Sequence, residues 1–240
     1  MPIFAITPAF LEKPIFSTFY NAFLEPPNWV AHLLIRYQHW LYYPVMAFAR
    51  FNLYAQAILH SVGAGPYSRK EVLHRRDLQI LALIGFWGWL IALTLQLPTW
   101  TSRVVFFLLA HNVAGILHVQ ITLSHFAMES YRGVTYDNEA NGYLYTQLNG
   151  SMDIDCPSWM DWFHGGLQFQ TVHHLWPRLP RSNLRKVQQV LISFCKEHDL
   201  KYYHVGFLEA NRIVLETLRN ASMSTKSLSE IYTDALNWNG

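Results

Sequence analysis

The sequence has little charge and almost no cysteine. Charged residues make up 14% of its 240 residues and the formal net charge is only +2, whereas about a quarter of the residues are charged in an ordinary soluble domain. No basic run of the kind that follows a phosphate backbone is present, which argues against nucleic-acid binding. Cys156 and Cys195 lie far apart without a CxxC spacing, so neither a disulfide framework nor a cysteine zinc site is indicated. A charge-poor chain with 15% aromatic residues is typical of a membrane-associated protein.

The sequence also lacks internal repeats and a signal peptide. At the N-terminus no basic stretch precedes an apolar core and a small-residue cleavage site. Instead Pro2, Pro8 and Pro14 interrupt any regular helix in the first residues. The chain is long enough to bury a core, but its length does not decide between one domain and two.

Long apolar runs, by contrast, are present. Residues 78–97 are twenty positions without a charge, which is the length that crosses about 30 Å of hydrocarbon. A second run, residues 104–124, has no full charge but contains histidine, asparagine and glutamine side chains. The short connection between the runs predicts a transmembrane helical hairpin, in which Pro98 ends the first helix. Four Lys and Arg residues within 68–77 predict that the hairpin tip faces the lumen.

The regions on either side of the hairpin are predicted to be helical as well. Residues 28–61, rich in Trp and Tyr, favour helices that lie in the membrane interface, with a break at Pro44. Residues 182–199 have the one-faced apolar spacing of an amphipathic helix, and a short helix is expected at about 206–219. Residues 220–240 are predicted to be a polar, mobile tail. The predicted fold class is therefore all-α and integral to the membrane, with a hairpin, interfacial helices and a cytosolic helical C-terminal region.

Histidines supply the candidate chemistry. Twelve histidines in 240 residues predict about 0.6 adjacent pairs by chance, so the pair His173 and His174 is no evidence by itself. His111, His118 and His125 recur every seven residues and therefore share one helix face. Each step rises about 10.5 Å, however, so a single ion cannot bind all three. His125, at the cytosolic end of the second span, is best placed to meet His173 and His174.

A structural role competes with metal binding at each of these positions. A lone histidine in a span is most often a packed, hydrogen-bonded group, which is the favoured interpretation for His111 and an equal alternative for His118. Metal binding is favoured for His125 taken with His173 and His174. A cluster of neutral imidazoles suits iron, and iron with open positions can activate dioxygen to attack an unactivated C–H bond. A lipid chain is the substrate that such a site at a membrane surface would meet.

Two segments carry a resemblance to a known family. HVQITLSHFAM at 118–128 and DIDCPSWMDWFHGGLQFQTVHHLWPRLPRSNLRKV at 153–187 resemble the C-terminal half of the membrane front-end fatty acid desaturases. The sequence is most similar to those of the Δ8 sphingolipid desaturases of fungi. The third histidine box of that family reads QxxHH, and here it consists of Gln170, His173 and His174. The resemblance extends over about residues 1–205.

The resemblance implies a lipid desaturase with a diiron centre held by histidine boxes. The implied substrate is the long-chain base of a ceramide or a fatty acyl chain, and the implied electron donors are cytochrome b5 and its reductase. The implied location is the endoplasmic reticulum membrane, with the histidines on the cytosolic side. By this resemblance His125, His173 and His174 are iron ligands and Gln170 fills the first place of the box. His118 and His164 belong to the family pattern as further ligands or as residues that support a ligand.

Several features of the family are missing from these 240 residues. The first (HxxxH) and second (HxxHH) histidine boxes, an earlier pair of spans and the HPGG motif of cytochrome b5 do not occur. Residues 1–219 are therefore expected to be a partial desaturase domain with an incomplete diiron site, inactive alone. The alternatives are a non-catalytic membrane module that binds lipid, an acyl-lipid front-end desaturase, and a hydroxylase that attacks the same C–H bond.

Overall fold

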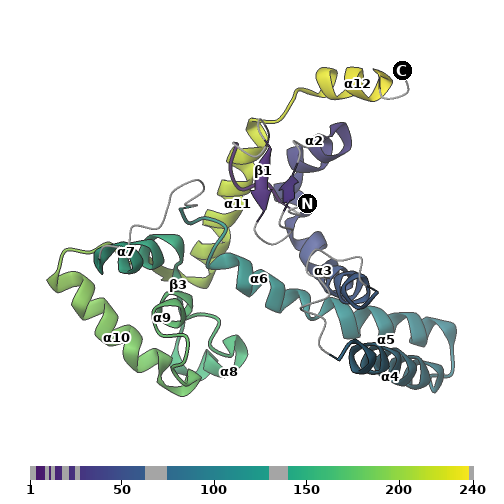
Figure 1. The fold of residues 1–240 in the computed structure, drawn as a ribbon, viewed down its shortest axis with the longest axis horizontal. Coiled ribbons are helices and arrows are strands. Elements are labelled where there is room, and N and C mark those ends of the chain that lie inside the picture. The colour runs from purple at the N-terminus through teal and green to yellow at the C-terminus, as the bar shows by residue number, and fades with distance from the viewer. Residues whose placement is uncertain are drawn as a thin grey trace. The chain divides into compact units, whose positions relative to one another are not determined.

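The chain folds into two compact units that consist mostly of helices (Figure 1). The computed structural model describes residues 4–8, 11, 14–17, 22–24, 28–62, 75–129 and 140–237. Unit 1 comprises Met1–His118 with Ser224–Gly240, and unit 2 comprises Val119–Met223. The predominance of helix agrees with the predicted fold class. Residues 63–74, which include most of the basic segment used to predict orientation, lie outside the described residues.

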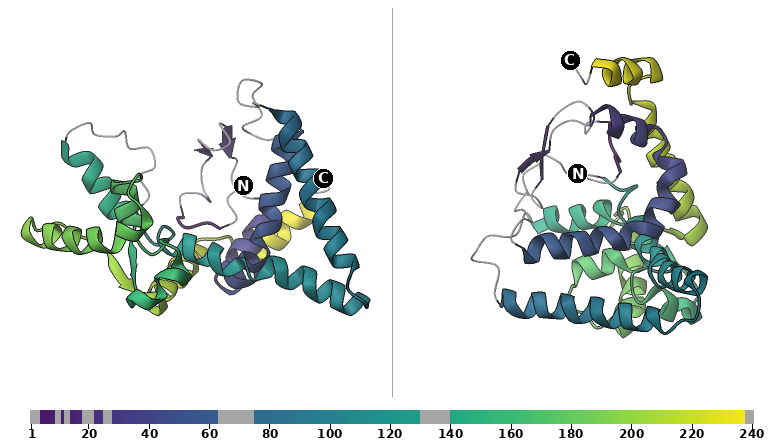
Figure 2. Two further views of the ribbon diagram at one scale, coloured as in Figure 1. Left: turned by 90° about the horizontal axis from the view of Figure 1, so that it is seen from below. Right: turned by 90° about the vertical axis from the view of Figure 1, so that its right-hand side faces the viewer.

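Unit 1 contains the apolar helices. Its elements are β1 (Ile15–Ser17), β2 (Ala22–Leu24), α2 (Trp29–Arg36), α3 (Gln38–Ser61), α4 (Arg76–Leu95), α5 (Trp100–Asn112) and α12 (Leu228–Asn237), and α6 (Gly115–Leu123) continues from it into unit 2. The two strands pair in antiparallel register, with Ile15 opposite Leu24. Helices α3, α4 and α5 pack against one another (Figure 2). The two long apolar helices α4 and α5 are therefore neighbours joined by a short connection.

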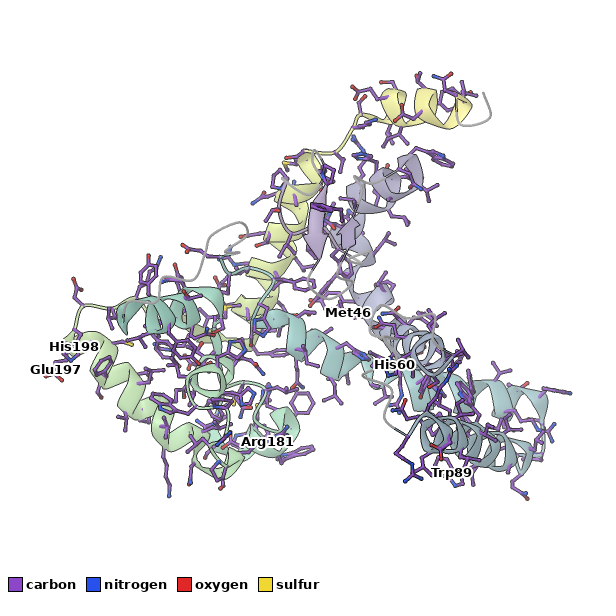
Figure 3. All side chains as sticks on the ribbon, viewed as in Figure 1. Met46, His60, Trp89, Arg181, Glu197 and His198 are labelled. Carbon is purple, nitrogen blue, oxygen red and sulfur yellow. The ribbon has the colours of Figure 1, made fainter. Side chains whose placement is uncertain are left out.

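Helix α4 carries apolar side chains on all of its faces. Only 6% of its most apolar window is buried inside the protein, whereas the core helix of a soluble protein is mostly buried. Leu81, Ile84 and Trp89 are 62%, 63% and 59% exposed, and Figure 3 labels Trp89 on this helix. Such exposure is costly in water and typical of contact with lipid. Within the described part of the chain, α4 and the stretch Trp100–Leu123 are the two helices long and apolar enough to cross a membrane.

The second apolar stretch, predicted as a span at residues 104–124, is helical over Trp100–Leu123 with a short turn inside it. It begins earlier, at Trp100, where Thr99 and Ser102 form a capping box. A turn at residues 113–114 then separates α5 from α6. Directly after this turn, a Cβ atom at Gly115 would lie 2.6 Å from the Cα of Ala47, so α3 and α6 approach closely only because residue 115 is glycine.

The turn also removes the basis for one continuous histidine face. His111 lies on α5, His118 lies on α6, and His125 lies in the turn that follows α6. A seven-residue spacing aligns side chains only along an uninterrupted helix. The shared face of these three histidines therefore stays a prediction.

Two further expectations about helix ends differ from the structure. Pro44 was expected to break residues 28–61 in two, but it lies inside α3, and the chain instead turns at Tyr37. A proline within a helix removes a single backbone donor, here the one to the carbonyl of Trp40, and the bonds on both sides of it continue the helix. Residues 220–240 were expected to form a polar tail without regular structure. Instead α11 continues to Met223 and α12 packs against α2, where Arg36 Nη1 donates to the carbonyl of Lys226 at 3.1 Å.

Unit 2 surrounds the predicted histidine box. Its further elements are α7 (Ala140–Gly150), β3 (Asp153–Asp155), η1 (Ser158–Met160), α8 (Asp161–His164), α9 (Gln170–Leu175), α10 (Arg181–Glu197), β4 (His204–Gly206) and α11 (Phe207–Met223). Strands β3 and β4 pair in parallel, with Asp153 opposite His204. The core consists of Leu148, Phe169, Val172, Leu184, Leu191 and Cys195. Much of this core lies between α9 and α10.

Helix α10 is the amphipathic helix predicted for residues 182–199. Leu184 and Leu191 are each 2% exposed, as their one-faced spacing predicts. The helix ends where Asp199 adopts a left-handed conformation with φ 52°. The amide of Leu200 then donates to the carbonyl of Cys195 at 2.8 Å, which completes a C-terminal cap.

Candidate metal centre

The QxxHH segment folds as the short helix α9, with its histidines pointing away from the core. Thr171 and Val172 are fully buried and attach the helix to unit 2. His173 and His174 follow Gln170 by three and four residues, which is about one helical turn. The three side chains therefore lie together on the opposite side of the helix. His173 is exposed, and His174 and Gln170 are half-buried. The core therefore sets the direction in which this segment presents its polar side chains.

The turn after α6 brings His125 to this helix. The rings of His125 and His174 stack with centroids 5.1 Å apart and planes inclined by 20°. The His125 ring is also hydrogen-bonded to the side chain of Gln170 and to the backbone of Gly150. The ring of His173 lies 6.2 Å from that of His174. The structure thus brings together four of the six predicted site residues.

Burial keeps the paired histidines in their neutral form. The pKa of His125 is lowered mainly by burial, against the opposing effect of its hydrogen bonds to Gly150 and Gln170. The pKa of His174 is lowered by burial and then by the nearby His125 and His173. A neutral imidazole offers a nitrogen lone pair to a metal ion, whereas a protonated one does not.

Helix α7 supplies two contacts that orient His174. The Nδ1 atom of His174 is hydrogen-bonded to Oε1 of Gln147 at 3.1 Å, and the hydroxyl of Tyr143 donates to the His174 carbonyl at 2.5 Å. A partner on one ring nitrogen leaves the other nitrogen available to a ligand. Sequence reasoning missed both residues. Their only signal is the spacing of four residues, which places them on one face of α7.

For the other two predicted site residues, the structure gives no contact with this pair among the described residues. His164, in α8, is 2% exposed and contacts the rings of Phe163 and Phe207, and its Nε2 atom has no hydrogen-bond partner among the described residues. His118 lies on α6 in unit 1 and is half-buried. Their assignment as ligands stays a prediction.

His111 shows the structural alternative that the sequence favoured. It is 2% exposed, its Nδ1 atom is hydrogen-bonded to the carbonyl of Phe107 at 2.6 Å, and its ring stacks on Phe51. A packed, hydrogen-bonded histidine of this kind needs no metal. The prediction of a structural role for His111 is confirmed.

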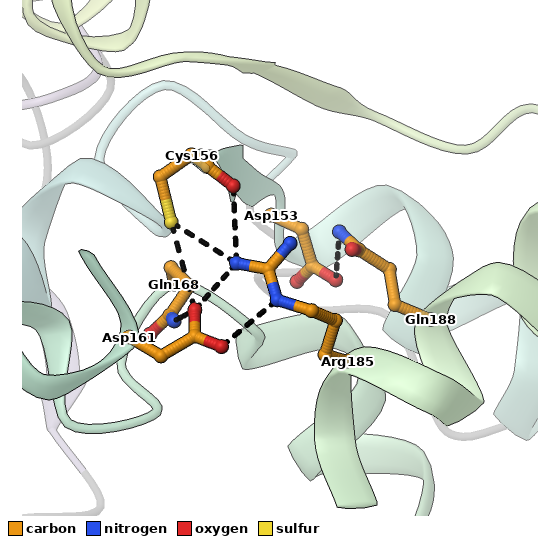
Figure 4. A network of polar contacts seen from close by, with 6 residues as sticks. All are labelled: Asp153, Cys156, Asp161, Gln168, Arg185 and Gln188. Carbon is orange, nitrogen blue, oxygen red and sulfur yellow. Dashed lines mark hydrogen bonds and ion pairs between the residues drawn. The ribbon is translucent and has the colours of Figure 1, made fainter. Parts of the chain in front are cut away.

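A polar network fixes the loop that leads into α9 (Figure 4). Arg185 of α10 forms an ion pair with Asp161, with Nε donating to Oδ2 at 2.9 Å, and its Nη2 donates to the carbonyl of Cys156 at 3.0 Å. Gln168 donates to the same carboxylate at 3.0 Å. The guanidinium also lies over the ring of Phe169, 5.2 Å from its centroid. The pKa of Asp161 is lowered chiefly by its hydrogen bond with Arg185, so the pair stays charged at neutral pH.

Comparison with known proteins identifies the family to which these residues belong. A family model described as "Fatty acid desaturase" matches residues 13–206. The chain belongs to the fatty acid desaturase family. Its relatives include a "Delta(8)-fatty-acid desaturase" of Helianthus annuus, 40% identical over 99% of this chain and 50% of that one. A "Delta 8-(E)-sphingolipid desaturase" of Kluyveromyces lactis is 40% identical over 96% of this chain and 39% of that one.

A third relative, an "Acyl-lipid (9-3)-desaturase" of Borago officinalis, is 37% identical over 87% of this chain and 45% of that one. This fatty acid desaturase chain therefore spans about half the length of the curated relatives that it matches. No solved structure matches it. The family together with two helices that can span a bilayer indicates a membrane protein.

The desaturase family uses iron, and the described residues fit that metal in donor type. His125 and His174 are neutral nitrogen donors in contact, with His173 next to them. In number they fall short: no three His, Cys, Asp or Glu side chains of the described ranges lie close enough to form a metal-binding group. The assignment of His125, His173 and His174 as iron ligands therefore stays a prediction.

Proposed function

We propose that this chain forms part of an oxygen-dependent lipid desaturase of the front-end type, acting on the long-chain base of a sphingolipid or on a fatty acyl chain. The observation that carries the proposal is the contact between two neutral imidazoles, that of His125 directly after the apolar stretch Trp100–Leu123 and that of His174 in α9. The names of the Helianthus annuus and Kluyveromyces lactis relatives support a Δ8 position and both substrate types. Desaturation removes two hydrogen atoms from the chain, and these atoms, together with two electrons from a reductant and two protons, reduce one dioxygen molecule to two water molecules.

In the proposed reaction the residues of this chain hold the iron and orient the imidazole rings that bind it. His125, His173 and His174 would bind iron, which supplies the power to oxidise an unactivated C–H bond. Gln170 orients His125 through their hydrogen bond, and Gln147 does the same for His174. His118 and His164 are the further candidate ligands.

The setting of the reaction follows from the apolar helices. Lipid chains reach the histidines from the bilayer, and a soluble reductant reaches them from the water phase. Cytochrome b5 and its reductase at the cytosolic face of the endoplasmic reticulum membrane are the partners that we propose. In this proposal residues 1–219 form the partial desaturase domain and residues 220–240 are the tail that follows it.

Removing a box histidine tests the proposal. In a complete catalytic unit that contains this chain, His174→Ala is expected to lower the yield of desaturated long-chain base or acyl chain by more than about 100-fold, because it removes a ligand rather than a residue that supports one. The measurement is lipid mass spectrometry of cells that lack the product and express that complete unit, together with the iron content of the purified protein. His111→Ala is the matched control, since His111 is packed structurally, and it should retain more than half of the wild-type iron content.

The same experiment separates the alternatives. Purified wild-type chain without iron, combined with unchanged lipids, would establish a non-catalytic membrane module. A hydroxylated lipid in place of an unsaturated one would establish a hydroxylase.

A further inference from the structure

We propose that Asp153 is a positioning residue for the histidine box: its buried carboxylate holds the start of α9, so that Gln170 and His174 face His125. The inference rests on the proposed function, because it assigns a task to a residue outside the ligand set. Asp153 lies in β3 and is completely buried. None of the contacts that bring the histidines together uses its side chain directly.

One carboxylate oxygen of Asp153 binds the first turn of α9. Oδ1 accepts a hydrogen bond from the amide of Thr171 at 2.7 Å, and Thr171 is the second residue of that helix. The first amides of a helix have no partner within the helix, and Phe169 at the N-cap position provides no side-chain bond. Asp153, which lies in strand β3, therefore caps the N-terminus of α9 in place of a local side chain.

The second oxygen ties the same carboxylate to the rest of unit 2. The hydroxyl of Tyr202 donates to Oδ2, and Nε2 of Gln188 lies 3.5 Å from it, as the dashed line between Gln188 and Asp153 in Figure 4 shows. The backbone of Asp153 is held as well, because its amide donates to the carbonyl of Tyr203 at 2.9 Å. Asp153 thus joins α9 to α10 and to the segment before β4.

A neighbouring hydrogen bond strengthens the same attachment. The hydroxyl of Ser151 donates to Oγ1 of Thr171 at 3.0 Å, and both residues are fully buried. Thr171 is therefore hydrogen-bonded to Asp153 through its amide and to Ser151 through its side chain. Val172, which is also fully buried, completes the contact of α9 with the core.

The charge of Asp153 points to positioning rather than to stability. Among the described residues no cation forms an ion pair with this carboxylate, whose partners are neutral donors. A buried carboxylate without a cation is costly, and apolar side chains of similar volume often stabilise a protein more. A fully hydrogen-bonded buried polar cluster favours a single geometry, because any other arrangement would leave a buried polar group without its hydrogen bond.

A six-residue helix depends on such an attachment. Short helices are marginal by themselves, so the direction of α9 is set by what its first turn binds. Rotation of α9 would separate Gln170 from His125 and His174 from Gln147. The loss of Asp153 is therefore expected to loosen the box while the rest of unit 2 stays folded.

The test compares Asp153→Ala, Asp153→Asn and Asp155→Ala in the full chain in detergent micelles. Asp155 is two residues further along β3, is exposed, and has His204 as its bonded partner, so Asp155→Ala is the matched control. Hydrogen exchange followed by mass spectrometry reports on α9 and α11 separately. Titration with Co²⁺ reports the geometry of bound nitrogen ligands through the visible absorption of cobalt.

In Asp153→Ala the amides of α9 are expected to exchange roughly tenfold faster, in line with the loss of a charged hydrogen bond. Cobalt should bind about tenfold more weakly and with an altered visible spectrum. In Asp153→Asn both effects should be at least halved on a logarithmic scale, because the amide oxygen can still accept from Thr171. Asp155→Ala should match the wild type.

The inference is overturned if α9 exchanges within twofold of the wild type in Asp153→Ala, or if α11 accelerates by the same factor as α9. The second outcome would show general destabilisation. A wild-type chain that binds no cobalt would count against the proposed function, and the exchange of α9 would still decide the role of Asp153.

Discussion

Single buried residues set the charge state around the histidine box. Burial raises the pKa of Asp153 to about 6, although hydrogen bonds from Tyr202, Thr171 and Gln188 act in the opposite direction. The same burial lowers the pKa of His125 and His174. Burial therefore shifts Asp153, His125 and His174 toward their neutral forms, and for the imidazoles this shift favours metal binding.

The raised pKa of Asp153 predicts a dependence of stability on pH. An acid with a pKa of about 6 in the folded protein and 3.8 as the unperturbed value binds more protons when folded. Stability from this group is therefore fully present below pH 3.8 and is lost as the pH rises through about 6. Between pH 5 and 7.5 the expected loss is on the order of 1 kcal/mol.

Urea denaturation of the full chain in micelles at the two pH values measures this contribution. Asp153→Asn cannot titrate, so the pH-dependent loss should be smaller in that variant by the same amount. Equal pH dependence of wild type and variant would contradict the assignment.

At the scale of elements, the close contact between α3 and α6 shows how one residue shapes the second span. Gly115 has the backbone of Ala47 where a side chain would be, whereas Gly88 on α4 has nothing within 4 Å. The apolar run in the sequence predicted the helix but not the close contact at Gly115, since that contact is made by a neighbour distant in sequence.

Replacing the two glycines by alanine should therefore have opposite effects. Gly115→Ala forces backbone atoms apart and is expected to destabilise the protein by about 1–3 kcal/mol. Gly88→Ala adds a better helix former in open space and is expected to stabilise by up to about 1 kcal/mol. Thermal unfolding in micelles measures both, and a Gly115→Ala variant as stable as Gly88→Ala would disprove the close contact.

For the whole molecule, the predicted orientation places the hairpin tip in the lumen and α10 in the cytosol. Trp100 at the tip is 76% exposed and Val190 on α10 is 67% exposed. In a background with Cys156 and Cys195 replaced by serine, Val190→Cys should react with a membrane-impermeant maleimide in sealed microsomes. Trp100→Cys should react only after the membrane is permeabilised, and labelling in the reverse order would overturn the orientation.

The sequence by itself determined the features that depend on local pattern. An uncharged run of twenty residues predicts a helix at α4, a one-faced spacing predicts α10, and the QxxHH segment indicates the desaturase family. Each of these can be read from neighbouring residues, because helix periodicity and chain length act over a few turns.

Only the tertiary structure decided which side chains meet. His125 and His174 are far apart in sequence, as are Asp153 and Tyr202, and the pairs form because α7, α9 and α10 pack on one core. Gln147 lies outside both quoted segments and Asp153 is not part of the QxxHH box, so their contacts appear only once the helices are in place. The physical reason is that hydrogen bonds and ring contacts act only over a few ångströms. The number of residues between two positions does not tell whether the fold brings them that close.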